Sequence, residues 1–490
     1  MKKSLLLSVL LTILFASQAQ TRYLDEVFPN VQITDSVVYA QNFGYGTNFT
    51  QLQNIVMDIY QPAGDVATNR PVVLLSHNGS FLPEVYTAGL AGLCFNGLND
   101  SSLVELCKRF ARRGYVAVCF DYRLGWNPTA PDQITRTKTI IQAVYRAMQD
   151  SKSCIRYFKN SYANGNPWGI DTSKFVLGGT NSGAYVALAA SSMNDPNELL
   201  NIKFQDINGS FIKQDSLGDF NGFGGFLNHD NYAGISSKFQ CVLSLGGAVG
   251  DTSWIQPGET PIIAFQGANE SGTPYNTAVV TTTTNQPVIE ASGSGDFMPY
   301  VEAAGNNNAF LPNNFLQGPA NINGFGQHTV SIEGLYPFYG QYFEPWNWYD
   351  PFCYGNSQQM QQLSDPGNSA NWASAAKGNR YIDTIMMYTL PRLYKLFIDH
   401  SFTGIRETNN TIAMSLFPNP ANSSVTISVD GSLVGSNLII TDITGRKIMA
   451  VKLSTVNCQL STDAFSSGIY FASIQLTDGT QATRKLLIEK

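Results

Sequence analysis

Residues 22–60 alternate between apolar and polar positions, as strands do. After them, continuous apolar runs and helically spaced apolar positions follow one another along the first part of the chain. Continuous apolar runs, typical of strands buried in a parallel sheet, cover residues 71–76, 115–120, 175–177, 241–245 and 261–265. Helical spacing of apolar positions predicts helices over residues 103–113, 137–160, 182–192 and 381–399. This order predicts an α/β protein with a doubly wound, largely parallel sheet and helices on both faces.

Two long segments interrupt this alternation. Residues 199–236 are rich in Gly, Asn and Phe and are a candidate cap or lid. Residues 276–380 are polar and rich in Asn, with an aromatic cluster at Trp346, Trp348 and Tyr349. Loops of this length usually carry function or decorate a surface, so both segments are candidates for contact with a ligand.

The pattern changes near residues 403–415 and then becomes one of short alternating strands. Strands are predicted over residues 424–429, 438–442 and 468–476. Their spacing is typical of a small β-sandwich of immunoglobulin-like type. We therefore expect a body over residues 20–405, a linker over 406–415 and a C-terminal sandwich over 416–490.

The first residues have the composition of a secretory signal peptide. Lys2 and Lys3 precede an apolar run from Leu5 to Phe15, and Ser17 and Ala19 supply the small residues of a cleavage site. We expect residues 1–19 to be a signal peptide that is removed. Since no other segment has about 18 uninterrupted apolar residues, we expect no membrane span in the mature protein.

Composition excludes several classes of function. Of 490 residues, 43% are hydrophobic and 13% are charged, with a formal net charge of −6, so the chain has no basic surface for nucleic acid. The seven cysteines include no CxxC pair, which argues against a zinc site. No metal-ligand spacing or phosphate-binding glycine motif occurs, so we expect neither a metal nor a cofactor.

Four short motifs in the C-terminal part come in a fixed order. They are Phe417-Pro418-Asn419-Pro420-Ala421, Asp442-Ile443-Thr444-Gly445-Arg446, Gly468-Ile469-Tyr470 and Lys485-Leu486-Leu487. Together they resemble the type IX secretion C-terminal sorting domain of Bacteroidota. The resemblance implies export by the type IX machinery to the cell surface or the medium, usually with cleavage of the domain. An ordinary immunoglobulin-like binding module is the alternative.

Two motifs of the body resemble the carboxylesterase branch of the α/β hydrolases. Ser76-His77-Asn78-Gly79-Ser80-Phe81 is similar to the HGGGF-type oxyanion loop, and Asp121-Tyr122-Arg123-Leu124 is similar to the DYRL segment of that branch. The resemblance implies that the backbone N–H groups of Gly79 and Ser80 face a developing oxyanion.

A third segment has the form of a nucleophile elbow but lacks the expected serine. In Gly179-Thr180-Asn181-Ser182-Gly183 the two glycines place Asn181 at the tip, where the family pattern has Ser. An amide is not a nucleophile, because its nitrogen lone pair is delocalised. Either Asn181 occupies the tip and Ser182 begins the following helix, or the turn shifts by one residue and Ser182 attacks.

The acid and base positions are also altered. Phe265-Gln266-Gly267-Ala268-Asn269-Glu270 resembles the family segment that carries the acid, with Glu270 at the acid position and Gln266 in place of a His. The catalytic base would follow in the chain, and His328 is the candidate. A loop histidine is more often a polar surface group, as His400 is expected to be.

Two functions are open. In the first, the protein is a secreted carboxylesterase-like hydrolase of acyl esters, with Ser182, His328 and Glu270 as the triad and Gly79 and Ser80 as oxyanion donors. In the second, it is a non-catalytic surface protein that binds a glycan or another small ligand. For that role, the aromatic cluster at residues 346–349 offers candidate stacking groups, with ordinary loop packing as the alternative.

Overall fold

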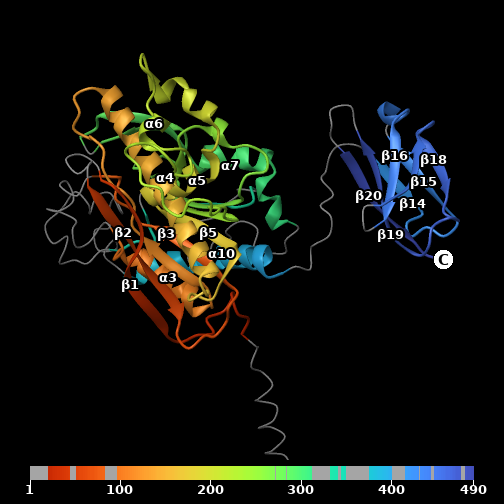
Figure 1. Cartoon of the computed structure of the whole chain (residues 1–490), viewed down its shortest axis with the longest axis horizontal. Helices are drawn as coiled ribbons and strands as arrows, with labels where there is room; N and C mark the ends of the chain where they lie inside the picture. Colours follow the sequence, from red (N-terminus) through yellow and green to blue (C-terminus); the bar gives the residue numbers. More distant parts are fainter. Residues whose placement is uncertain are drawn as a thin grey trace, which may run out of the picture. The chain divides into compact units, whose positions relative to one another are not determined.

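The computed structural model describes the chain in two compact units, Met1–His400 and Ser401–Lys490 (Figure 1). The residues described are 20–44, 51–82, 97–270, 272–282, 284–311, 332–339, 344–348, 375–399, 414–429, 431–442, 446–475 and 481–490. In this part of the chain, no helix is both long and apolar enough to cross a bilayer. The predicted signal peptide lies outside the described residues, and the predicted domain boundaries stay predictions.

The first unit is built on an eight-stranded sheet with the order β1-β2-β4-β3-β5-β8-β10-β13. Its strands are β1 (Val31–Phe43), β2 (Leu52–Pro62), β3 (Arg70–Ser76), β4 (Val116–Phe120), β5 (Ile170–Thr180), β8 (Cys241–Leu245), β10 (Ile262–Gly267) and β13 (Leu335–Phe338). Strand β2 runs antiparallel to both of its neighbours, and all pairs from β4 to β13 are parallel. This strand order and the single reversed strand are those of the α/β-hydrolase sheet.

Helices cover both faces of this sheet, as the alternation of strands and helices predicted (Figure 1). The four long helices are α3 (Ser101–Arg112), α4 (Gln133–Ala163), α5 (Ser182–Ser192) and α10 (Ala375–Phe397). Along β3, Val72 and Leu74 belong to the core beneath α4 and α5, whereas Val73 and Leu75 belong to the core beneath α3 and α10. Because both faces are buried, the strand reads as one continuous apolar run.

The segment that follows α5 lies against α4. It contains the short elements η2 (Pro196–Leu200), η3 (Ile202–Phe204), β6 (Gln205–Asp206), β7 (Gly209–Ser210) and α6 (Gln214–Leu217). Tyr145 donates to the Gly218 carbonyl at 3.0 Å, and Gln149 donates to the carbonyls of Leu217 and Asp219, each at 2.8 Å. The candidate cap therefore covers α4.

The polar segment before α10 contains more regular structure than its composition predicts. Within it lie β11 (Ala278–Thr281), β12 (Pro287–Gly293), α7 (Ser294–Ala303), η5 (Asn306–Phe310) and β13, none of which the sequence analysis predicted. Just before it lie β9 (Ala248–Val249) and η4 (Thr252–Trp254), which were not predicted either. Strands β11 and β12 pair with each other, and β12 also pairs with β9. Strand β13 has only four residues, too few to show a period.

The second unit consists of two antiparallel sheets around one core. One sheet has the order β14-β15-β18 and the other β17-β16-β19-β20. The strands are β14 (Met414–Phe417), β15 (Ser424–Val429), β16 (Asn437–Asp442), β17 (Lys447–Lys452), β18 (Asn457–Ser461), β19 (Gly468–Gln475) and β20 (Gln481–Ile488), with η8 (Gly431–Leu433) between β15 and β16. Val425 and Ile427 from one sheet meet Ile440, Ala472 and Leu486 from the other in a shared apolar cluster.

The first and last sorting motifs contact each other in this unit. The backbone N–H of Leu487 donates to Asn419 Oδ1 at 2.8 Å, and Ala421 forms an isolated bridge with Ile488. The backbone N–H of Ala421 also donates to the carbonyl of Leu487 at 2.8 Å. The Pro-Asn-Pro segment and the last strand therefore fold as one structure, which explains why the two motifs occur together.

Candidate functional site

A sharp bend between β5 and α5 holds Asn181 at its tip. The backbone of Asn181 has φ +47° and ψ −112°, and its N–H donates to the carbonyl of Leu245 at 2.7 Å. A Cβ atom on Gly179 would lie 2.5 Å from the carbonyl carbon of Gly183, and one on Gly183 would lie 2.2 Å from the carbonyl oxygen of Ser76. The bend therefore requires glycine on both sides, and this geometry matches the first interpretation of the elbow.

The side chain of Asn181 is tied to the acid position. Its Nδ2 donates to Oε1 of Glu270 at 3.1 Å, and its Oδ1 accepts from the hydroxyl of Thr273 at 3.3 Å. Asn181 is 8% exposed and Glu270 is 6% exposed, so this contact is shielded from water. In a hydrolase triad an imidazole lies between the nucleophile and the acid. Here the two residues at those positions contact each other directly.

Glu270 lies just after β10 in an environment that favours its neutral form. Burial raises the pKa of the Glu270 carboxyl well above its usual range, the charge of Glu344 adds to this, and a backbone hydrogen bond from Thr273 opposes it. Its Oε2 is buried and has no hydrogen-bond partner among the described residues. Glu270 is therefore poorly suited to stabilise a protonated imidazole, which requires an ionised acid.

Ser182 occupies the first turn of α5 and is 2% exposed. Its Oγ accepts the backbone N–H of Ser80 at 3.0 Å, lies 3.0 Å from the hydroxyl of Tyr122 and donates to Asn78 Oδ1 at 3.3 Å. Burial raises the pKa of Tyr122, with the bond to Ser182 opposing, so the phenol is not a base near neutral pH. The Ser182 hydroxyl therefore has structural partners and no activating group among them.

The two predicted oxyanion donors both have acceptors within the protein. The Ser80 N–H is bound to Ser182 Oγ, and the Gly79 N–H donates to Asn78 Oδ1 at 2.6 Å. Asn78 stands where the family pattern has glycine, and its Nδ2 also donates to Glu344 Oε2 at 3.3 Å. A substrate oxyanion would have to displace these side chains, which is unlike a preorganised oxyanion hole.

His77 stabilises the same loop. Its Nε2 lies 3.0 Å from Asp121 Oδ1, its Nδ1 contacts the carbonyl of Asn78, and its ring stacks on Tyr122 with centroids 4.7 Å apart. Burial alone lowers the pKa of His77, but the hydrogen bond and the charge of Asp121 outweigh burial, so the pKa is raised. Both ring nitrogens are engaged, so His77 holds the turn and is not directed at Ser182.

Gln266, which stands in place of a family histidine, joins β10 to the segments after it. Its Nε2 donates to the carbonyls of Thr273 and Pro274 at 3.0 and 3.1 Å. Its Oε1 accepts from the backbone N–H and the hydroxyl of Ser294 at 2.9 and 2.7 Å. Gln266 thus positions Thr273, which in turn holds the amide of Asn181.

Several predicted residues fall elsewhere. His328, His400 and Tyr349 lie outside the described residues. Trp346 is fully buried and packs 6.2 Å from the ring of Phe338, so it does not fit the candidate stacking surface. Trp348 packs partly buried against the same core. Ordinary loop packing therefore describes these two tryptophans.

The sequence analysis did not single out four residues of this site as contacts: Asn78, Tyr122, Thr273 and Glu344. Tyr122 was visible within the DYRL motif and Asn78 within the oxyanion-loop motif. Thr273 and Glu344 lie in irregular segments, where spacing gives no contact information. In the described part of the chain no group of three or more His, Cys, Asp or Glu could hold a metal ion.

The strand order and the elbow place the body in the class of α/β-hydrolase folds. Residues 415–489 match the family described as the secretion system C-terminal sorting domain. The chain therefore carries a type IX sorting domain and is exported, to the cell surface or the medium. No curated protein sequence matches the chain.

Among solved structures, the chain is similar to Thermogutta terrifontis esterase 2. The form phosphorylated by paraoxon shows 17% identity and a TM-score of 0.37, covering 67% of this chain and 89% of that chain. The form phosphoramylated by tabun shows 16% identity and a TM-score of 0.39, covering 76% and 98%.

Proposed function

We propose that this protein is an exported, non-catalytic member of the α/β-hydrolase fold that acts as a surface binding protein. The single observation that carries the proposal is the direct hydrogen bond from Asn181 Nδ2 to Glu270 Oε1, 3.1 Å long. It joins the nucleophile position to the acid position and leaves no room for an imidazole between them. Loss of the nucleophile alone costs a serine hydrolase about 10⁶ in rate.

The surroundings of Asn181 support the same conclusion. Both candidate oxyanion donors, Gly79 and Ser80, are bonded to side chains of the protein. Glu270 is held towards its neutral form by burial and by Glu344. Asn181 at the tip opposes attack, the engaged N–H groups of Gly79 and Ser80 oppose oxyanion stabilisation, and a neutral Glu270 opposes stabilisation of the protonated base.

The alternative proposal keeps hydrolysis and assigns the attack to Ser182. It is favoured by the position of Ser182, which follows the tip residue and has its Oγ 3.0 Å from the N–H of Ser80, within the predicted oxyanion loop. It requires His328 as the base and Glu270 as its partner. The contacts of Asn181 with Glu270 and Thr273 would then have to break.

Hydrolysis of short p-nitrophenyl esters by the purified mature protein tests the proposal. We expect the wild type and Ser182→Ala to hydrolyse the esters no faster than buffer. Hydrolysis by the wild type that disappears in Ser182→Ala would overturn the proposal. Gain of hydrolysis in Asn181→Ser would support descent from an active hydrolase with only the tip residue lost.

For export, we propose removal of residues 1–19 as a signal peptide in a Bacteroidota host and an immunoglobulin-like topology for residues 416–490. The small residues Ser17 and Ala19 support cleavage of the signal peptide after residue 19. The two antiparallel sheets around one core support the immunoglobulin-like topology. We expect the exported protein to begin at residue 20, which N-terminal sequencing of protein from the cell surface or medium tests. A protein that retains its apolar N-terminus would contradict the assignment.

A further inference from the structure

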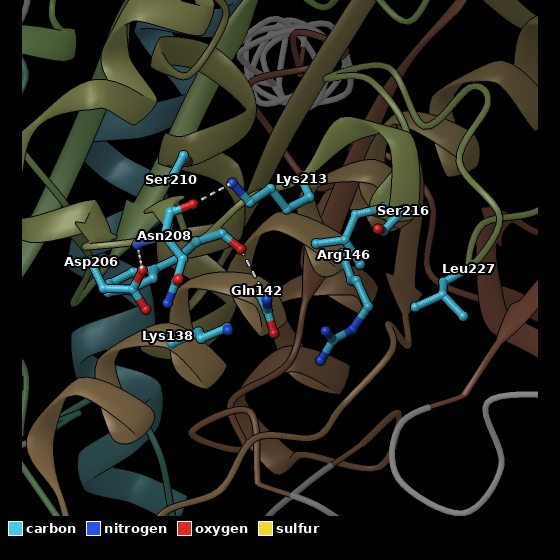
Figure 2. A pocket seen from close by; sticks show the side chains of 12 residues that line it. Lys138, Gln142, Arg146, Asp206, Asn208, Ser210, Lys213, Ser216 and Leu227 are labelled. Carbon is cyan, nitrogen blue, oxygen red and sulfur yellow. Dashed lines mark hydrogen bonds between the residues drawn. The ribbon is translucent and has the colours of Figure 1, made fainter.

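A cavity of about 200 Å³ with polar and apolar walls lies between the first half of α4 and the segment that contains β6, β7 and α6 (Figure 2). Helix α4 contributes Lys138, Gln142 and Arg146 to its lining. These residues are spaced four apart, so they lie along one face of the helix. The facing segment contributes polar groups of residues 206–216. The cavity is thus made by two elements that the chain brings together over about 70 residues.

The lining carries an excess of positive charge. Lys138, Arg146 and Lys213 face the cavity with one acidic residue, Asp206. The carboxylate of Asp206 already accepts the backbone N–H of Asn208 at 2.7 Å. An anion that enters the cavity therefore meets three cations and one engaged carboxylate.

The buried cation of the cavity is held in place. Arg146 is 3% exposed, and its Nη2 donates to the carbonyl of Gly125 at 2.6 Å. The nearby Asp150 makes its ion pair with Arg123, with Arg123 Nε 2.9 Å from Asp150 Oδ1. Arg146 is therefore a fixed part of the cavity wall.

Two further lining side chains, Gln142 and Lys213, are fixed by bonds to backbone carbonyls. Gln142 Nε2 donates to the carbonyl of Phe211 at 2.9 Å, and Lys213 Nζ donates to the carbonyl of Asn208 at 3.0 Å. An ammonium group has three donors, so Lys213 retains two for a ligand. Figure 2 shows both bonds at the cavity. Such a preformed site binds a ligand with little loss of side-chain freedom.

One side of the cavity is apolar. Phe211, Leu217 and Leu227 line it, and Phe211 and Leu217 are 4% and 6% exposed. The volume is many times the roughly 10–15 Å³ that one water molecule requires, so the cavity can admit a compact molecule of about the size of a monosaccharide. The combination of basic, hydrogen-bonding and apolar walls is typical of small-molecule sites.

We infer that this cavity binds a small organic anion, in which a carboxylate or phosphate group on a sugar-sized body meets Arg146, Lys138 and Lys213. Both oxyanions match the donors of Arg and Lys. The apolar wall takes the hydrophobic face of the body, and Asn208 and Gln142 lie beside its hydroxyl groups. The inference does not depend on the absence of catalysis at Asn181, because none of the lining residues belongs to that site.

Isothermal titration calorimetry of the mature chain tests the inference with three probes: D-glucuronate, glucose 6-phosphate and neutral D-glucose. We expect at least one of the two anions to bind and glucose to bind no more than weakly. The anion that binds identifies the charged group of the ligand. Binding should weaken with added NaCl, because Lys138 and Lys213 are exposed and salt screens exposed charges.

Lys138→Gln and Lys213→Gln should each weaken anion binding about fivefold, the effect of losing one exposed charge contact. Lys238→Gln is the matched control, because Lys238 is an exposed lysine of the same unit outside the cavity lining. Unchanged tryptophan fluorescence shows that the variants are folded. Absence of anion binding, equal binding of glucose, or equal effects of Lys138→Gln and Lys238→Gln would overturn the inference.

Discussion

The amide of Asn181 donates a hydrogen bond to the carboxyl of Glu270 over 3.1 Å, in a place where both side chains are almost completely buried. The hydroxyl of Thr273 completes the contact by donating to the other side of the amide. In an acyl-transfer enzyme an imidazole lies between these positions, takes the proton of the nucleophile and is oriented by the acid. Here the amide and the carboxyl contact each other directly, with one carboxyl oxygen, Glu270 Oε2, left without a hydrogen-bond partner among the described residues.

Asn181→Asp should destabilise the first unit. The substitution keeps the shape of the side chain but replaces the Nδ2 donor with an oxygen that faces Glu270. We expect a loss of about 2–3 kcal/mol in the free energy of unfolding near neutral pH, because the Nδ2 donor is lost and a second carboxyl group is buried beside Glu270 and Glu344. Denaturant unfolding followed by tryptophan fluorescence measures it, since all six tryptophans precede residue 400.

The matched control for Asn181→Asp is its combination with Glu270→Gln. The double variant exchanges donor and acceptor, so a hydrogen bond between the two positions can form again. We expect the double variant to recover most of the lost free energy of unfolding. Additive losses from the two substitutions would mean that the side chains do not interact as described.

Glu270→Gln should change how stability depends on pH. Because the native pKa of Glu270 is raised, the native state binds this proton more tightly than the unfolded state does. In the wild type, the contribution of this group is full at pH values below the unfolded pKa of about 4.3 and is lost as pH rises towards the native pKa. Denaturant unfolding across this range should show a decline with pH in the wild type that is smaller in Glu270→Gln. An equal decline in both proteins would exclude Glu270 as its source.

Ser182→Ala should cost stability. The substitution leaves the part-buried N–H of Ser80 without its acceptor and removes the buried contacts of the hydroxyl with Tyr122 and Asn78, a loss of about 1–2 kcal/mol. Ser191→Ala is the matched control, because Ser191 lies in the same helix and its buried hydroxyl has no hydrogen-bond partner among the described residues. We expect the control to be neutral or slightly stabilising in denaturant unfolding. Equal losses in both variants would show that the Ser80 contact is unimportant.

Gly183→Ala should disrupt the elbow. A methyl group there would lie 2.2 Å from the carbonyl oxygen of Ser76, a backbone atom that cannot move aside as a flexible side chain could. We expect a loss of more than about 3 kcal/mol, which thermal unfolding measures. Gly64→Ala is the control, because Gly64 has φ +78° and open space around it, so an added methyl group there strains the backbone without a clash. It should cost only about 1 kcal/mol, and a similar small cost for Gly183→Ala would contradict the described bend.

Much of the body follows from its apolar pattern. Residues 182–192 and 241–245 form the predicted helix and strand with the predicted bounds, because buried elements with strong patterns leave few alternatives. The helix predicted over 137–160 extends over Gln133–Ala163, since Asp132 caps its start by accepting the N–H of Thr135. Strand β13 was missed, because four apolar and aromatic residues have no distinctive period.

The candidate site was only partly predictable. Gly179 and Gly183 place Asn181 at the bend, since a crowded turn restricts its neighbours to glycine. The contact of Asn181 with Glu270 joins positions 89 residues apart, and that of Asn78 with Glu344 joins positions 266 apart. One sequence gives no information on such pairs when one partner lies in an irregular segment. The partners of Ser182 and Gly79 were therefore visible only in three dimensions.

Covalent labelling of Ser182 is the most direct test of the central claim. The purified mature protein is treated with a fluorophosphonate probe, which reacts with activated serine hydroxyls, and its intact mass is measured. We predict no adduct, because the Ser182 hydroxyl is held by Ser80, Asn78 and Tyr122 and has no base among these partners. A stoichiometric adduct that maps to Ser182 and is absent from Ser182→Ala would contradict the account.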